Sequence, residues 1–173
     1  PYSWSKEYDL IISVLKLLRL SNIGTVVELG CNDGGLAVTC LRELGNQLTW
    51  TGYDFLPQHI QRTRWHPNYK AVLLDKYLWE TNMDPFDVFI TSHVLEHLYP
   101  EEVQALAQWL STRAKYLILV APVGTFATAE HAKQSGHILT KGSIWISDVF
   151  QSVGFVPIWI TGRWFGWFQK KSP

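Results

Sequence analysis

The sequence has few cysteines, no long apolar run and no secretory signal. Its two cysteines, Cys31 and Cys40, form neither a disulfide framework nor a Cys-x-x-Cys metal pair. It contains no apolar run of about 18 residues, so no membrane-spanning helix is expected. The N-terminus lacks the basic-then-apolar pattern of a signal peptide. We therefore expect a cytoplasmic protein in a reducing environment, with no membrane partner.

The sequence also lacks an excess of charge of either sign. Lys and Arg total 15, as do Asp and Glu, so the formal net charge is zero. A neutral chain lacks the broad basic field that non-specific nucleic-acid binding needs, which disfavours nucleic acid as a partner but leaves a local patch open. No motif specifies an oligomeric state. The chain opens on Pro1, which leaves open whether it is part of a larger protein.

Short β-branched runs alternate with amphipathic segments along the 173 residues, which suit one domain over 1–173. Strands are predicted over 25–29, 48–53, 69–74, 86–91 and 116–121. Helices are predicted over 5–20, 34–44, 57–64, 100–114 and 143–153. Strands over 155–161 and 164–170, joined at Thr161-Gly162-Arg163, form a closing antiparallel pair. The pattern predicts an α/β fold, Rossmann-like and doubly wound, with a seven-stranded, mostly parallel sheet in three layers (α/β/α) and an antiparallel C-terminal hairpin.

The segment Glu28-Leu29-Gly30-Cys31-Asn32-Asp33-Gly34 joins the first predicted strand to the next helix. Gly30 allows a sharp turn, and Gly34 and Gly35 allow close approach of a ligand to the backbone. The first-turn amides of the helix have no internal partners and can bind a polar or negative group. In open α/β sheets ligands lie outside the carboxyl ends of the strands. The loop predicts a nucleotide cofactor site, with an ordinary glycine-rich turn as the alternative.

Two acidic residues follow the next two predicted strands. Asp54 ends the second strand, where a carboxylate can accept both hydroxyls of a ribose. Asp75 closes the third strand, where a carboxylate can accept a hydrogen bond from an adenine amino group. Either residue alone could be a helix cap or a turn residue. Together with the first loop, in order at successive strand ends, they favour a nucleoside ligand.

Longer stretches resemble a known family. Val26 to Gly34 resembles motif I of the class I S-adenosylmethionine-dependent methyltransferases. Phe86 to Leu98, with the element His-Val-Leu-Glu-His-Leu, resembles the motif IV region of their small-molecule (type 11/12-like) branch. Gly136-His137 and the segment from Ser143 to Phe155 are similar to that branch's late helix and strand. One departure is Asn32, where the family often has a second glycine, although Asn tolerates a left-handed backbone.

This resemblance implies S-adenosylmethionine as the cofactor and assigns roles to individual residues. Glu28 would orient the loop near the cofactor's amino group, and Asp54 would hold the ribose hydroxyls. Asp75 would meet the adenine amino group, helped by the backbone of Lys76. Ser92 and His93 would close the site beside the sulfonium. The other implied cofactor residues are Gly30, Cys31 and Asn32 beside the methionine part, Gly34 at the helix start, and Phe55 or Leu56 against the adenine.

Methyl transfer needs a nucleophile aligned with the sulfonium methyl and, for some acceptors, a base. His93 is the best-placed candidate base. His97, one turn later, is the second candidate, although bracing of the helix is the favoured interpretation for it. His137 lies in the predicted substrate loop over 122–142. The spacing of these histidines does not form a tight metal box, so no metal is expected.

The resulting hypothesis is methyl transfer to an O, N or C acceptor, most simply a small molecule. The N-terminal helix over 1–20 could close over the cofactor as a partial lid, or could simply pack on the sheet. Two alternatives remain. One is a catalytically reduced methyltransferase-like domain that serves a larger protein as a binding or regulatory module. The other, a nicotinamide oxidoreductase, would require Gly-x-Gly-x-x-Gly, which Asn32 interrupts. No motif specifies the methyl acceptor.

Overall fold

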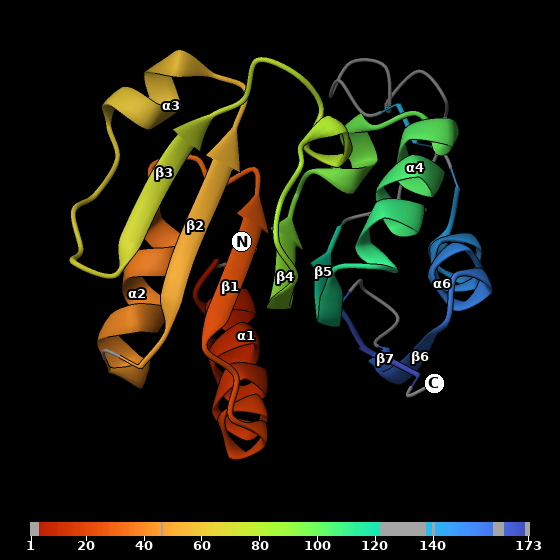
Figure 1. Cartoon of the computed structure of the whole chain (residues 1–173), viewed down its shortest axis with the longest axis horizontal. Helices are drawn as coiled ribbons and strands as arrows, with labels where there is room; N and C mark the ends of the chain where they lie inside the picture. Colours follow the sequence, from red (N-terminus) through yellow and green to blue (C-terminus); the bar gives the residue numbers. More distant parts are fainter. Residues whose placement is uncertain (1–3, 46, 122–137, 140, 161–164, 172–173) are drawn as a thin grey trace.

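A computed structural model describes residues 4–45, 47–121, 138–139, 141–160 and 165–171. Within these residues the strands form one seven-stranded sheet in the order β3-β2-β1-β4-β5-β7-β6, which confirms the predicted fold (Figure 1). β7 pairs antiparallel with both β5 and β6, while the pairings among β1 to β5 are all parallel. The strands are β1 (Thr25–Leu29), β2 (Thr49–Asp54), β3 (Tyr69–Leu73), β4 (Phe86–Ser92), β5 (Ala114–Val120), β6 (Phe155–Ile160) and β7 (Phe165–Lys170).

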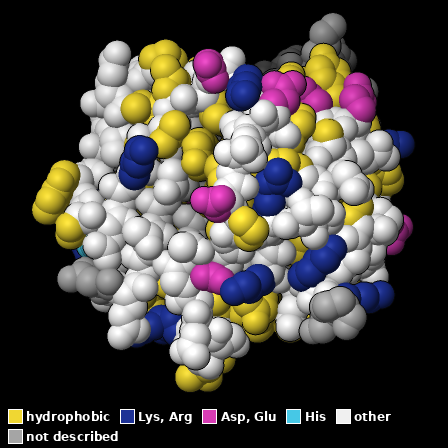
Figure 2. Space-filling model, in the orientation of Figure 1, with side chains coloured by type: hydrophobic (Ala, Val, Ile, Leu, Met, Phe, Trp, Pro, Cys, Tyr) yellow, Lys and Arg dark blue, Asp and Glu magenta, His cyan; other side chains and the backbone are white. Residues whose placement is uncertain are grey.

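Helices cover both faces of this sheet (Figure 1). The α-helices are α1 (Trp4–Leu18), α2 (Gly35–Leu44), α3 (Pro57–Gln61), α4 (Pro100–Leu110) and α6 (Ser143–Ser152). Short 3-10 helices are η1 (Arg19–Ser21), η2 (Leu78–Glu80) and η3 (Leu95–His97). Figure 2 shows basic and acidic side chains interspersed over one face of the molecule. None of the helices in the described part of the chain has both the length and the apolar character needed to cross a bilayer.

The alternation of side chains along each central strand divides the core into two layers. On β1, Val26 packs with the apolar residues of α1 and α2, whereas its neighbour Val27 packs with those of α4 and α6. On β4, Val88 likewise packs in the layer of α1 and α2, and Phe89 packs in the layer of α4 and α6. Because these strands are covered on both faces, they are apolar in near-continuous runs, as buried parallel strands are.

Several element boundaries differ from the sequence-based prediction. The helix predicted over 57–64 ends at Gln61, and the one predicted over 100–114 ends at Leu110. After Leu110 the hydroxyl of Thr112 turns back to bond a helix carbonyl, and Arg113 O accepts the N–H of Phe86, so Ala114 already belongs to β5. The predicted hairpin turn at Thr161-Gly162-Arg163 lies outside the described residues.

Candidate active site

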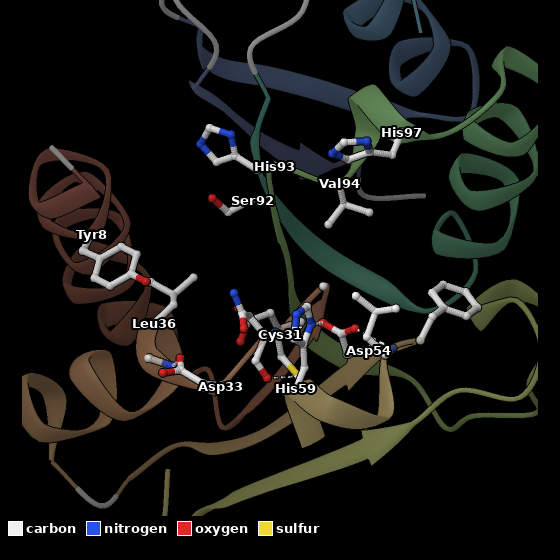
Figure 3. A pocket seen from close by; sticks show the side chains of 16 residues that line it. Tyr8, Cys31, Asp33, Leu36, Asp54, His59, Ser92, His93, Val94 and His97 are labelled. Atoms are coloured by element: carbon white, nitrogen blue, oxygen red, sulfur yellow. Dashed lines mark hydrogen bonds and ion pairs between the residues drawn. The ribbon is translucent and has the colours of Figure 1, made fainter. Parts of the chain in front are cut away.

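A cavity of about 450 Å³ opens at the carboxyl ends of β1, β2 and β4, and is called the strand-end cavity below (Figure 3). Parallel strands bring these ends to one edge of the sheet, where a ligand meets several loops at once. Ten of the residues predicted from the sequence line it: Glu28, Gly30, Cys31, Asn32, Asp54, Phe55, Leu56, Ser92, His93 and His97.

The turn after β1 is tightly packed around Gly30. Its φ is 79°, in the left-handed region, and its N–H donates to Tyr53 O at 2.7 Å. A Cβ at this position would stand 2.1 Å from Cγ2 of Val94, so only glycine lets the turn after β4 approach. The turn therefore requires glycine for two separate reasons, backbone conformation and space.

Asp54, at the end of β2, holds the loop that follows β1 as well as its own loop. Its Oδ2 accepts the backbone N–H of Asn32 and its Oδ1 that of Leu56, both at 2.9 Å. His59 Nδ1 lies 3.1 Å from Oδ2. Asn32 has a φ of 50°, which Asn adopts more readily than most residues. A carboxylate has about four lone-pair directions, so Asp54 keeps capacity for a ligand hydroxyl while organising both loops.

Glu28 is an acidic residue almost fully buried within the sheet. The indole N–H of Trp50, on the neighbouring strand β2, donates to its Oε2 at 2.9 Å. Burial raises the pKa of Glu28 to about 8, and this hydrogen bond only partly opposes the shift. Glu28 lines the strand-end cavity, so a cationic group entering it would find a carboxyl able to ionise.

His93 lies between two carboxylates. Its Nε2 is 3.1 Å from both carboxylate oxygens of Glu7, on α1, and its Nδ1 is 3.4 Å from Oε1 of Glu96, on η3. Burial by itself lowers the pKa of His93, but the hydrogen bonds and charges of Glu7 and Glu96 outweigh it and raise the pKa to about 9. The ring is therefore a cation at neutral pH, with a carboxylate at each nitrogen.

The comparisons with known proteins agree with this geometry. A family model described as a methyltransferase domain matches residues 4–150. The chain belongs to the methyltransferase domain family. The class I S-adenosylmethionine-dependent methyltransferase resemblance inferred from the sequence is thus confirmed. No curated protein matches the sequence significantly.

Solved structures share the methyltransferase fold at low sequence identity. Magnesium protoporphyrin IX methyltransferase (ChlM) from Synechocystis PCC 6803 with bound SAH is 16% identical, with 99% of this chain and 89% of that chain covered and a TM-score of 0.69. The methyltransferase domain of bacterial CtHen1-C is 19% identical, with 96% and 97% covered and a TM-score of 0.69. The small RNA methyltransferase HEN1 is 17% identical, with 98% and 25% covered and a TM-score of 0.68. At these identities the likeness shows the fold alone.

Some predicted residues of this methyltransferase domain lie apart from the strand-end cavity. Gly34 is the N-cap residue of α2 and does not line it. Asp75 and Lys76 line a second, more open cavity of about 480 Å³, which also meets Phe55. Phe55 thus borders both cavities. His137 and most of the predicted loop over 122–142 lie outside the described residues.

Gly35, predicted to allow close approach of a ligand, also lines the cavity. Five lining residues were given no individual role in cofactor binding or catalysis: Tyr8, Asp33, Leu36, His59 and Val94. Figure 3 shows Tyr8 extending from α1 toward Leu36. Asp33 is held by Arg64, whose Nη2 lies 2.8 Å from Oδ2. Position in the motif could have suggested Asp33, but Tyr8 and His59 reach the cavity only through tertiary packing.

The lining of the cavity suits an amphipathic ligand. Ser92 Oγ is buried and has no hydrogen-bond partner among the described residues, although it borders the cavity. Leu36 and Val94 form an apolar part of the cavity wall. Burial raises the pKa of Cys31 to about 12, so its thiol is a neutral wall group rather than a nucleophile. Among the described residues, no group of three His, Cys, Asp or Glu side chains is arranged to hold a metal ion.

Proposed function

We propose that the protein transfers a methyl group from S-adenosylmethionine, held in the strand-end cavity, to an acceptor. The observation that carries this proposal is the convergence of Glu28, Asp54 and Ser92 on one cavity in a methyltransferase domain. These groups come from three different strands, and each offers polar capacity toward the cavity. The orphaned hydroxyl of Ser92 and the carboxyl of Glu28, which can ionise beside a cation, fit a ligand with several polar groups and a positive charge.

The residue roles in this proposal follow the order of the strands. Glu28 receives the amino group of the methionine part, beside the Gly30–Asn32 turn. Asp54 receives the ribose hydroxyls while it braces Asn32 and Leu56. The adenine lies against Phe55, and Asp75 and Lys76 in the second cavity contact the edge of the adenine that carries its amino group. Phe55 borders both cavities, which supports this placement. Gly34 and Gly35 leave the helix start open to close approach.

When bound, the cofactor supplies an electrophilic methyl group on a sulfonium. The chain's part is to orient an acceptor in line with that methyl and to exclude water. A base role for His93 requires a neutral ring with an open nitrogen, whereas Glu7 and Glu96 favour the cation and face both nitrogens. We therefore assign His93 a structural role, as the link between Glu7 of α1 and Glu96 of η3. His97, which lines the cavity, is kept as the candidate base. His137 remains a candidate on sequence grounds.

A small molecule is the favoured acceptor. The neutral net charge supports this choice, because polyanion binding draws on a basic surface. A similar fold occurs both in an enzyme named for magnesium protoporphyrin IX and in one named for small RNA, so RNA is the alternative acceptor to be tested.

The experiment that tests the function has two stages. Calorimetry with S-adenosylmethionine and S-adenosylhomocysteine tests the cofactor, with NAD as the comparison. Binding of NAD alone would overturn the proposal. An acceptor library assayed for release of S-adenosylhomocysteine then tests transfer.

The second candidate function is a methyltransferase-like binding or regulatory module of a larger protein. The engagement of both ring nitrogens of His93 by carboxylates favours it, because it removes the expected base. Cofactor binding without product from any acceptor, small molecules and RNA included, would support this module in place of the enzyme.

A further inference from the structure

Glu7 is an acidic residue buried in the first turns of α1, with only 4% of its surface exposed. A buried carboxylate is costly unless it is paired. Both of its oxygens lie 3.1 Å from Nε2 of His93, 86 positions later in the chain. The contact therefore joins the N-terminal helix to the turn that follows β4, two segments that are far apart in the sequence.

The opposite side of His93 is also fixed. Nδ1 lies 3.4 Å from Glu96 Oε1, and the backbone N–H of His93 donates to Val120 O at 2.8 Å. The φ of His93 is 58°, a left-handed value that is uncommon for non-glycine residues, although His adopts it more often than most. Glu96 O in turn accepts the N–H groups of Ile138 and Leu139 at 2.7 and 3.0 Å. His93 thus links α1 to the turn after β4, and the backbone carbonyl of Glu96 joins that turn to the segment at 138–139.

The residue next to Glu7 forms part of the cavity wall. Tyr8 lines the strand-end cavity, and its ring extends from α1 toward Leu36 (Figure 3). Farther along α1, Ile11 and Leu15 are fully buried in the core layer shared with α2. The later turns of α1 are therefore held by apolar packing, whereas its first turns combine the packing of Tyr8 against the same core layer with the polar contact of Glu7.

We infer that Glu7 is a positioning residue of the cofactor site: through the His93 imidazolium it holds the first turns of α1 against the turn after β4 and keeps Tyr8 in the cavity wall. This inference rests on the proposed cofactor function. It makes α1 a fixed wall at neutral pH, and the wall loosens when His93 loses its proton. The ionisable groups that border His93 are Glu7 from α1 and Glu96 from η3. Those that line the same cavity are Tyr8 from α1, Glu28 from β1, Cys31 and Asp33 from the loop after β1, Asp54 from β2, His59 from α3 and His97 from η3.

The test compares Glu7→Gln with Asp9→Asn. Both remove one negative charge from the same helix without changing side-chain size, but Asp9 is exposed. In the ligand-free protein, Glu7→Gln should lower the pKa of His93, followed by NMR of its ring proton, by about one pH unit. It should also speed hydrogen exchange in the first turns of α1 but not around Leu15. Asp9→Asn should change neither.

Cofactor affinity supplies a separate measurement. Glu7→Gln should weaken S-adenosylhomocysteine binding by about tenfold, the order expected for loss of a charge-assisted contact. Glu7→Asp, which retains the charge, should recover part of that loss. His93→Asn tolerates the left-handed backbone; adding Glu7→Gln to it should have little further effect, because the two residues act through one contact.

The outcomes separate the inference from the proposed function. If the His93 titration and the exchange of α1 are the same in Glu7→Gln as in the unmodified protein, Glu7 does not position α1 and the inference fails. If the unmodified protein does not bind S-adenosylhomocysteine, the proposed function fails instead. The titration and exchange measurements on ligand-free protein still decide whether Glu7 holds the helix.

Discussion

The carboxylate of Asp54 accepts the backbone N–H of Asn32 at 2.9 Å, across the loops that follow two neighbouring parallel strands. A second acceptor bond, from the N–H of Leu56, holds the loop of Asp54 itself. One side chain therefore organises both loops before any ligand is present. This preorganisation lowers the ordering cost of binding.

Replacing Asp54 with Ala should cost about 1–3 kcal/mol of stability, because two backbone donors lose their acceptor. It should also weaken cofactor binding by more than tenfold. Asp87→Ala is the matched control: Asp87 accepts the N–H groups of Gly24 and Thr25 at the opposite end of the sheet. It should lose stability but retain affinity. Urea unfolding and calorimetry measure the two effects, and unchanged affinity in Asp54→Ala would refute our site placement.

Substitutions at Asn32 test whether its left-handed backbone conformation matters for stability and cofactor affinity. Asn32→Gly should preserve or slightly improve stability and cofactor affinity, since glycine adopts a φ of 50° without strain. Asn32→Val should cost about 1–3 kcal/mol, because a β-branched residue is strained there. Thermal unfolding with and without S-adenosylhomocysteine distinguishes the two. Equal behaviour of both variants would mean that the backbone conformation is unimportant.

Gly30→Ala should be severely destabilising, since it combines a left-handed backbone with a Cβ 2.1 Å from Val94 Cγ2. Gly45→Ala is the control: its φ of 76° is similar, but no atom of the described residues beyond its chain neighbours lies within 4 Å of an added Cβ. It should lose only the conformational strain, about 1–3 kcal/mol. Adding Val94→Ala to Gly30→Ala should relieve the clash and recover part of the difference. No recovery in chemical unfolding would contradict the packing argument.

Cofactor binding at pH 7 should release up to about one proton, because Glu28, with a pKa of about 8, ionises when it meets a cationic amino group. Calorimetry in two buffers of different ionisation enthalpy measures this release. Glu28→Gln should abolish it, whereas Glu101→Gln, on the exposed first turn of α4, should not. A release that survives in Glu28→Gln would assign the proton to another group.

Stability should fall as pH rises toward 9. The pKa of His93 is raised from 6.5 to about 9 on folding, so its contribution is fully present below 6.5 and is lost as pH rises through 9. Its upper limit is about 3 kcal/mol. Burial of Glu28 acts in the same direction, but over pH 4.5 to 8. Burial also raises the pKa of Cys31 and Cys40 above the ordinary thiol value of 9, so both thiols lower stability further above pH 9. Those groups act alike in the unmodified protein and in His93→Asn, so the difference between the two in urea unfolding from pH 6 to 10 isolates His93 and should narrow as pH rises through 9.

Much of the lining of the strand-end cavity could be predicted from sequence because its signals are local. Strand ends, glycines and acids follow one another in the chain, and the parallel topology brings them together without further information. The role of His93 was harder to predict for a different reason. Its protonation depends on Glu7, and neither the motif nor its spacing connects a residue at the start of α1 with one after β4.

The sequence by itself determined the mostly parallel sheet covered on both faces and the loop from Glu28 to Gly34, because continuous apolar runs and glycine turns are properties of neighbouring residues. Only the tertiary structure decided that Tyr8 and His59 reach the cavity, that Asp75 borders a different one, and that His93 is a cation between two carboxylates. Those outcomes depend on helix packing over the sheet, which sets burial and charge pairing between residues far apart in the chain.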